Sequence, residues 1–189
     1  MTDTAVQTIP QAGTWDADPV HSSLDFTIRH MMATKVRGRF TDWTATLTTG
    51  SSAGDATLEA VIQAASVTTF NEQRDGHLRS ADFFESDKYP TLEFRSTSVS
   101  ELGTDNRFTV TGDLTAHGVT NPVTLDVEFA GIFVDQRGST KATFSATTEI
   151  ERERWGLTWN QPLGNGGFML GKAIKVEVEV QFALRAEQQ

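Results

Sequence analysis

The stretch KAIKVEVEVQFALR, from Lys172 to Arg185, decides the fold class. Apolar residues occupy one parity of this stretch, and charged or polar residues occupy almost all of the other. Alternation of this kind over twelve residues is typical of a β-strand with one face in a dry interior and the other in water. The apolar face carries Ile174, Val176, Val178, Val180, Phe182 and Leu184. The question is whether this apolar face packs only against other side chains or also against a molecule that is not protein.

The same alternation recurs along most of the chain. It appears at residues 21–30, 57–63, 91–99, 107–118, 120–131 and 141–152. The apolar parity flips between Phe40 and Trp43, which predicts a β-bulge there. It stops in the segment around 69–84, where Thr69 and Glu72 fit a capping box and predict the start of a short helix. We therefore expect about eight strands and one short helical segment.

Composition excludes several classes of protein. The formal net charge of −9 argues against a nucleic-acid footprint and against an anionic membrane surface as a standing partner. The absence of cysteine excludes disulfides, thiolate metal sites and thiol nucleophiles. No apolar run is long enough to span a membrane, so we expect no stable membrane insertion.

The beginning of the chain predicts organisation and location. Residues 1–12 form a polar stretch that we expect to be a flexible arm, and residues 13–186 are expected to form a single domain. The arm lacks the basic and apolar regions of a secretory signal, which favours a cytoplasmic location.

Two architectures bury one face of about eight strands, a sandwich and a closed barrel. Several strands here reach ten or more residues, against a usual length of about five to six, and long strands favour an all-β antiparallel barrel. Such a barrel is either filled by its own side chains or hollow enough for one small ligand. Small residues on the apolar parity bear on this choice: Gly38, Ala45, Ala60, Gly112, Ala142 and Ala146. Small residues opposite large ones also occur in a filled core, so both alternatives stay open on the pattern alone.

Four separated blocks carry a resemblance to a known family. They are WDADPVHSSLDFTIRHMMATKVRGRF, HLRSADFFESDKYPTLEFRS, GDLTAHGVTNPVTLDV and IERERWGL followed by GKAIKVEVEV, in one order along nearly the whole chain. Together they resemble the YceI-like polyisoprenoid-binding proteins. The resemblance implies an extended, eight-stranded, lipocalin-like barrel that holds an isoprenoid lipid, such as a polyprenyl phosphate or a quinone tail. It also implies a homodimer, no cofactor apart from the bound lipid, and a role as carrier, reservoir or scavenger. Family members occur with and without export signals.

Parity and resemblance together nominate the ligand-binding residues. The apolar wall is predicted to comprise Phe26, Ile28, Phe40, Leu92, Phe94, Phe108, Val110, Leu125, Val127, Phe144, Val176 and Val178. The mouth or headgroup site is predicted to comprise His30, Arg152, Arg154, Trp155, Phe168, Met169 and Lys172. Each of the three basic residues could meet a phosphate, although taken singly we interpret each as a solvated surface residue.

An enzyme is the main alternative, and a filled barrel serving as an interaction scaffold is another. No metal site or catalytic residue is predicted, because no local His and carboxylate spacing suggests metal ligation and no nucleophile or phosphate-loop motif is present. His21 and His30 would lie on opposite faces of one unbroken strand. His77 and Asp82 are five residues apart, a spacing that leaves an acid–base pair open.

Overall fold

The computed structural model describes residues 10–164 and 166–186, and the regular structure in this part of the chain is mostly strands. The strands are β1 (Gly13–Ala17), β2 (Ser23–His30), β3 (Thr34–Phe40), β4 (Trp43–Thr49), β5 (Thr57–Gln63), β6 (Val67–Thr68), β7 (Thr91–Val99), β8 (Arg107–Ala116), β9 (Val119–Val134), β10 (Thr140–Glu151) and β11 (Leu170–Leu184). They are accompanied by the helix α1 (Glu72–Arg79) and the 3₁₀ turns η1 (Ala53–Asp55), η2 (Ala64–Ser66) and η3 (Arg152–Trp155).

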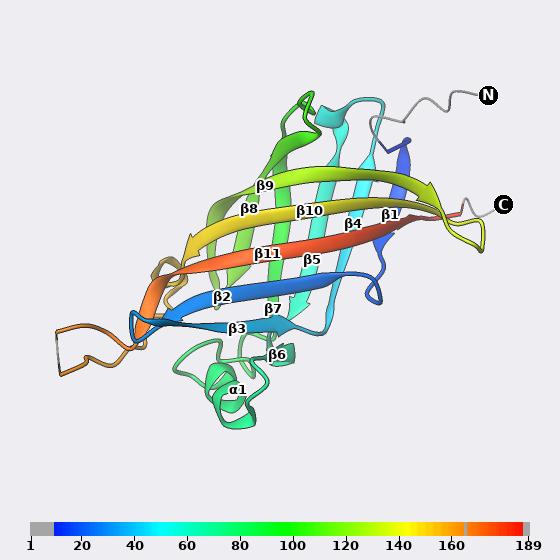
Figure 1. Ribbon diagram of the computed structural model, residues 1–189. Helices are drawn as coiled ribbons and strands as arrows, with labels where there is room; N and C mark the ends of the chain where they lie inside the picture. The colour runs from blue at the N-terminus through cyan, green and yellow to red at the C-terminus, as the bar shows by residue number, and fades with distance from the viewer. Residues whose placement is uncertain (1–9, 165, 187–189) are drawn as a thin grey trace.

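The strands close into an antiparallel barrel (Figure 1). The barrel has eight strand positions around its ring, some filled by one strand and some by two in succession, and we call each position a stave. β1, β4, β5, β7, β8, β9, β10 and β11 follow one another around the ring, and β1 pairs with both β4 and β11 to close it. β2, β3 and β6 continue the staves begun by β1, β4 and β5, because β2 pairs with β11 and β3 pairs with β2 and β6. The predicted eight-stranded lipocalin-like barrel is confirmed.

Three staves are therefore broken into two pieces. The flip of parity after Phe40 corresponds to a complete interruption between β3 and β4 at residues 41–42 rather than to a bulge within one strand. A second interruption, residues 18–22, separates β1 from β2. His21 lies in that interruption and is exposed, so the condition of an unbroken strand joining it to His30 is not met.

The helix begins later than predicted. Its N-cap is Asn71, whose side-chain oxygen accepts a hydrogen bond from the Arg74 backbone N–H at 2.9 Å. Thr69 does not cap the helix, because Phe70 has a left-handed backbone (φ +61°) that separates it from the first turn. Instead, the Thr69 hydroxyl donates to Asp75 at 2.5 Å.

The barrel has two different ends. At one end lie the turn at 31–33, the long segment 69–90 that contains α1, the turn at 117–118 and the loop 152–169, and we call this the helical end. At the other end lie the loops 50–56, 100–106 and 135–139 together with the first and last described residues, and we call this the terminal end. In Figure 1, α1 lies beside β3 and β6, below the barrel as drawn.

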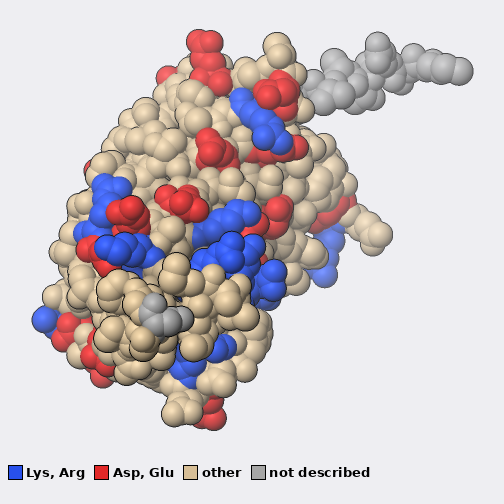
Figure 2. Space-filling view, turned by 60° about the vertical axis from the view of Figure 1, so that its left-hand side comes forward, with Lys and Arg blue, Asp and Glu red and all other residues tan. Residues whose placement is uncertain are grey.

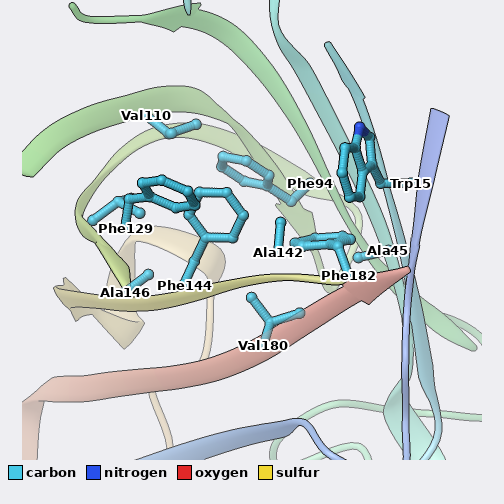
Figure 3. Packing of buried hydrophobic residues seen from close by; sticks show 11 residues of the cluster. Trp15, Ala45, Phe94, Val110, Phe129, Ala142, Phe144, Ala146, Val180 and Phe182 are labelled. Carbon is cyan, nitrogen blue, oxygen red and sulfur yellow. The ribbon is translucent and has the colours of Figure 1, made fainter. Parts of the chain in front are cut away.

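Aromatic rings pack closely in the half of the barrel toward the terminal end (Figure 3). The Phe144 ring lies 5.1 Å from the Phe129 ring, 6.0 Å from the Phe182 ring and 6.2 Å from the Phe108 ring, measured between centroids. We call these four residues the aromatic cluster. Nearby, Trp15 is completely buried and its indole N–H donates to the Thr49 hydroxyl at 3.0 Å.

Two of the predicted small residues serve packing rather than empty space. A Cβ atom at Gly112 would lie 2.5 Å from the Phe94 ring, and one at Gly38 would lie 2.4 Å from the Phe26 ring. Each ring therefore occupies the volume that a side chain at the glycine would need. Of the remaining small residues, Ala142 is fully buried, whereas Ala45, Ala60 and Ala146 border open space inside the barrel.

Candidate ligand-binding cavity

A cavity of about 450 Å³ lies inside the barrel. Its lining reaches both ends, since it includes Pro10 and Ala53 at the terminal end and Leu78 and Met169 at the helical end. Nearly all of the lining is apolar, and the volume lies within the range of about 300–1,000 Å³ that is usual for small-molecule sites. The barrel is thus hollow rather than filled.

Four aliphatic residues on the inner face show where the packing stops. Ile28, Val36, Ile174 and Val176 border the cavity, are only half-buried, and pack against neither of the two clusters of buried apolar side chains. We call them the aliphatic wall. Three of them are neighbours across strands, because Ile28 pairs with both Val36 and Ile174, and Val176 lies two residues from Ile174 on the same face of β11.

The opening stretch of sequence therefore has two environments along one face. Val180 and Phe182 are buried in the packed half, 8% and 4% exposed. Ile174 and Val176 line the same cavity from the same face of β11 but stay half-buried. Side chains that point into the barrel yet keep exposed surface indicate a volume that the chain does not fill itself.

All twelve residues predicted for the apolar wall line the cavity. They come from β2, β3, β7, β8, β9, β10 and β11. That a ligand contacts them stays a prediction.

The residues predicted for the mouth separate into two groups. His30, Arg152, Trp155 and Met169 line the cavity. Arg154, Phe168 and Lys172 lie outside its lining: Arg154 stacks over the Trp155 ring at 5.4 Å, Lys172 forms an ion pair with Glu153 at 2.9 Å, and Phe168 is 54% exposed.

Arg152 is not a solvated surface residue, contrary to the interpretation from sequence. It is 2% exposed, and its guanidinium donates to the backbone carbonyl oxygens of Gly171 at 2.9 Å, Trp159 at 2.9 Å and Leu157. The chain can fold back over it because Gly156, which follows η3, has a left-handed backbone (φ +75°).

Arg152 lacks a direct carboxylate partner. Within residues 10–164 and 166–186, the guanidinium forms no direct ion pair, although the Glu153 carboxylate, which pairs with Lys172, acts on it electrostatically, and its Nη2 is buried without a hydrogen bond. Burial lowers the pKa of this guanidinium. A buried cation with no directly paired carboxylate and an unsatisfied N–H is costly, so this end of the cavity favours a ligand group that can accept a hydrogen bond.

The segment 69–90 supplies the other polar groups that border the cavity. Arg74 donates to the Thr69 hydroxyl at 2.7 Å and to its backbone carbonyl at 3.0 Å, and both residues line the cavity. His77 Nε2 lies 2.8 Å from a carboxylate oxygen of Asp82, and the His77 ring packs edge-on against Phe83 and Trp159. The sequence did not predict Thr69, Arg74 and Leu78 as cavity residues, since this segment has no periodicity that reveals which side faces the barrel.

The described part of the chain gathers no group of three His, Asp or Glu side chains suited to a metal ion. It also contains no helix with the length and apolar character needed to cross a bilayer.

Comparison with known proteins shows the family to which this chain belongs. A sequence model of the YceI-like domain matches residues 15–185. The chain belongs to the YceI-like family. A UPF0312 protein of Staphylococcus aureus strain USA300 is 40% identical over 170 residues, which is 88% of this chain and 95% of that protein.

Solved structures similar to this chain share the barrel. The YceI protein of Campylobacter jejuni matches with a TM-score of 0.72 and 29% identity, covering 84% of this chain and 91% of that one. BcnA of Burkholderia cenocepacia matches with a TM-score of 0.74 at 20% identity, covering 87% and 98%. A polyisoprenoid binding domain from Saccharophagus degradans matches with a TM-score of 0.65 at 17% identity, covering 93% and 100%. At such identities the last two show a common fold.

Proposed function

We propose that this YceI-like protein binds an isoprenoid-type lipid, a polyprenyl phosphate or a quinone, with the tail in the barrel, and serves as its carrier, reservoir or scavenger. The observation that carries the proposal is the unpacked aliphatic wall along a cavity of about 450 Å³. The description of the Saccharophagus degradans domain as polyisoprenoid-binding supports the choice of ligand class.

The energetics of a branched tail suit this cavity. Burying apolar surface contributes about 0.8 kcal/mol per CH₂, so one five-carbon isoprene unit contributes roughly 3–4 kcal/mol before costs. Ordering the tail and losing translational freedom offset much of this gain. Methyl branches and double bonds stiffen the tail and so reduce the entropy that is lost. Affinity should rise with tail length until the cavity is full and then stay constant.

The head of the lipid is proposed to lie at the helical end. Arg152 offers a buried cation there, with His30, Trp155 and Met169 also on the lining. A phosphate or a quinone carbonyl would satisfy the free Nη2, and the phosphate would also supply a direct counter-charge. Arg154 and Lys172 are exposed just outside, where a larger head would meet them.

We propose binding rather than catalysis. Of the acid–base pair that the sequence left open, only His77 lines the cavity; Asp82 lies outside the lining, and both side chains are substantially exposed. The filled-barrel scaffold loses its main support, because the interior is hollow. A homodimer and a cytoplasmic location remain predictions, to be checked by light scattering of the purified protein and by cell fractionation.

The test is extraction of the protein purified without detergent, followed by mass spectrometry of the organic phase. An isoprenoid present in near-stoichiometric amount supports the proposal. Extracts that contain only ordinary acyl lipids, or no lipid, contradict it. Turnover of the extracted compound by the protein would favour the enzyme instead.

A further inference from the structure

The hairpin formed by β2 and β3 ends in a turn that breaks the ordinary rules for turns. Met31 and Met32 both have left-handed backbones (φ +50° and +59°), and the Ala33 N–H donates to the His30 carbonyl at 3.1 Å. Two consecutive residues with positive φ make a type I′ turn, for which Asn-Gly is strongly preferred. This conformation is unfavourable for methionine, because in the left-handed region the Cβ atom lies too close to the following carbonyl oxygen.

The same two side chains are unusually exposed. Met31 is 50% exposed and Met32 is 74% exposed, and Phe168 beside them is 54% exposed. The Met31 N–H donates to the carbonyl of Met169 at 2.7 Å, which joins the hairpin tip to the loop that carries Phe168. Exposed apolar side chains that gather on a strained backbone indicate a surface that contacts another apolar phase.

The outward face of this hairpin is basic, although the whole chain has a net charge of −9. Residues 26–41 contain four Arg or Lys and no Asp or Glu. Arg29, Lys35 and Arg37 are exposed, and each lacks an ion-pair partner within the described residues, whereas Arg39 pairs with Asp25. Figure 2 faces the side of the molecule on which the hairpin tip lies and shows basic side chains gathered across its middle, with acidic ones among them.

Protection of a free strand edge does not explain this pattern. Among the described residues, β3 pairs on its outer side only at Arg39 and Phe40, so the part from Thr34 to Gly38 is an unpaired edge. Charged residues of either sign keep such an edge from pairing with another chain. An acidic protein that places only positive charges here therefore matches a negatively charged partner.

The hairpin also borders the cavity. His30 precedes the exposed methionines and lines the cavity, as do Ile28 and Val36 on the inner face. The hairpin thus has an apolar tip, a basic outer face and an apolar inner face that continues into the aliphatic wall.

We propose that the hairpin tip of Met31 and Met32, flanked by Arg29, Lys35 and Arg37, docks on the surface of an anionic lipid bilayer. The methionines enter the interfacial region, and the basic side chains meet lipid headgroups. Docking in this way would bring the cavity next to the bilayer with which it exchanges its lipid. This role of the docking rests on the proposed function. The expectation from the whole-chain charge was the opposite, because it averaged over this local separation of charge.

The experiment is flotation of the full chain with vesicles of phosphatidylcholine, alone or mixed with phosphatidylglycerol, at low and at high ionic strength. The expected result is binding to the mixed vesicles only, weakened by salt. The variant R29Q/K35Q/R37Q should partition roughly a hundredfold less, at about tenfold for each 1.4 kcal/mol and about 1 kcal/mol per basic residue.

The variant M31N/M32G tests the apolar tip without threatening the fold, because it installs the preferred type I′ sequence. We expect it to lose most vesicle binding. The matched control is V134T, at the end of β9 on the opposite, terminal end of the barrel. It alters an apolar residue that is 63% exposed, and the variant should bind vesicles as the unaltered protein does.

Several outcomes overturn the docking: no binding to mixed vesicles at low salt, equal binding to pure phosphatidylcholine, or M31N/M32G binding like the unaltered protein. An equal loss in V134T also overturns it. Native mass spectrometry of the same samples reports the cargo separately. Cargo retained without vesicle binding overturns only the docking, whereas vesicle binding by a protein that never carries an isoprenoid overturns only the proposed function.

Discussion

The aromatic cluster and the aliphatic wall face the same interior from opposite halves of one barrel. Phe129, Phe144 and Phe182 are each less than 10% exposed, and the Phe144 ring packs against the other two. The aliphatic wall has the same inward direction and the same apolar character, yet it touches neither packed cluster. Both regions line the cavity, but only the aromatic cluster is also packed, so pointing inward is a different property from being packed.

The largest effect should come from truncating the two regions in parallel. Phe144→Ala removes a ring from a packed cluster and should lower the unfolding free energy by about 3–5 kcal/mol. Val176→Ala removes surface that already borders open space and should cost about 1 kcal/mol or less. Urea denaturation of lipid-free protein measures both. Equal losses would mean that the two halves are packed alike.

The second prediction concerns Asp18, in the interruption that joins β1 of the packed half to β2 of the hollow half. Burial raises the pKa of Asp18, but hydrogen bonds from His21 and Lys141, both at 3.1 Å, and from the Val20 N–H outweigh it and lower the pKa from 3.8 to about 2. A depressed carboxyl pKa stabilises the fold above its unfolded-state value, and this contribution is lost as the pH falls from 3.8 toward about 2.

Asp18→Asn should therefore cost about 1.5–3 kcal/mol at neutral pH, since charged hydrogen bonds are lost and the buried Lys141 ammonium loses its partner. Its stability should also fall less steeply between pH 3.8 and about 2 than that of the unaltered protein. Urea denaturation across a pH series measures this. If the unfolding free energies of the two proteins changed in parallel with pH, Asp18 would not contribute to the acid sensitivity of the fold.

The third prediction fills the hollow half. Val176→Trp should occupy part of the cavity and lower the fraction of protein that carries lipid by about tenfold, equivalent to about 1.4 kcal/mol, with little change in stability. Native mass spectrometry measures the occupancy. Glu177→Gln, one residue along β11 on the outer face, is the control. Unchanged occupancy in the tryptophan variant would place the lipid elsewhere.

The smallest effect concerns the turn between β2 and β3. M31N/M32G should raise the unfolding free energy by about 1 kcal/mol, because it relieves two left-handed methionines. Urea denaturation beside the V134T control is sensitive enough to detect it. A loss of stability would show that the methionines support the fold rather than burden it.

The sequence predicted which residues face inward, and it did so well. Alternation identified the inner face of β11 and all twelve wall residues that line the cavity. It could not show whether the space was occupied, because that depends on which side chains reach across from other staves. Gly38 and Gly112 looked like sources of space, yet the rings of Phe26 and Phe94 lie over them.

The sequence was least informative where periodicity ends. Arg152 follows a clean strand and reads as a surface residue, but a left-handed Gly156 folds the next loop over it. The start of α1 was misplaced because Thr69 and Glu72 match a capping box that Asn71 replaces. Both errors lie in connections, where long-range contacts rather than local pattern set the conformation.

One strand crosses both halves without a break. β11 runs for 15 residues and changes its neighbour on one side from β2 to β1 along its length, whereas on its other side it pairs with the continuous β10. It therefore joins the two pieces of the interrupted stave. We expect the helical side to adjust its girth to cargoes of different thickness while the aromatic side keeps its shape, which would let one barrel accept several chemically related lipids.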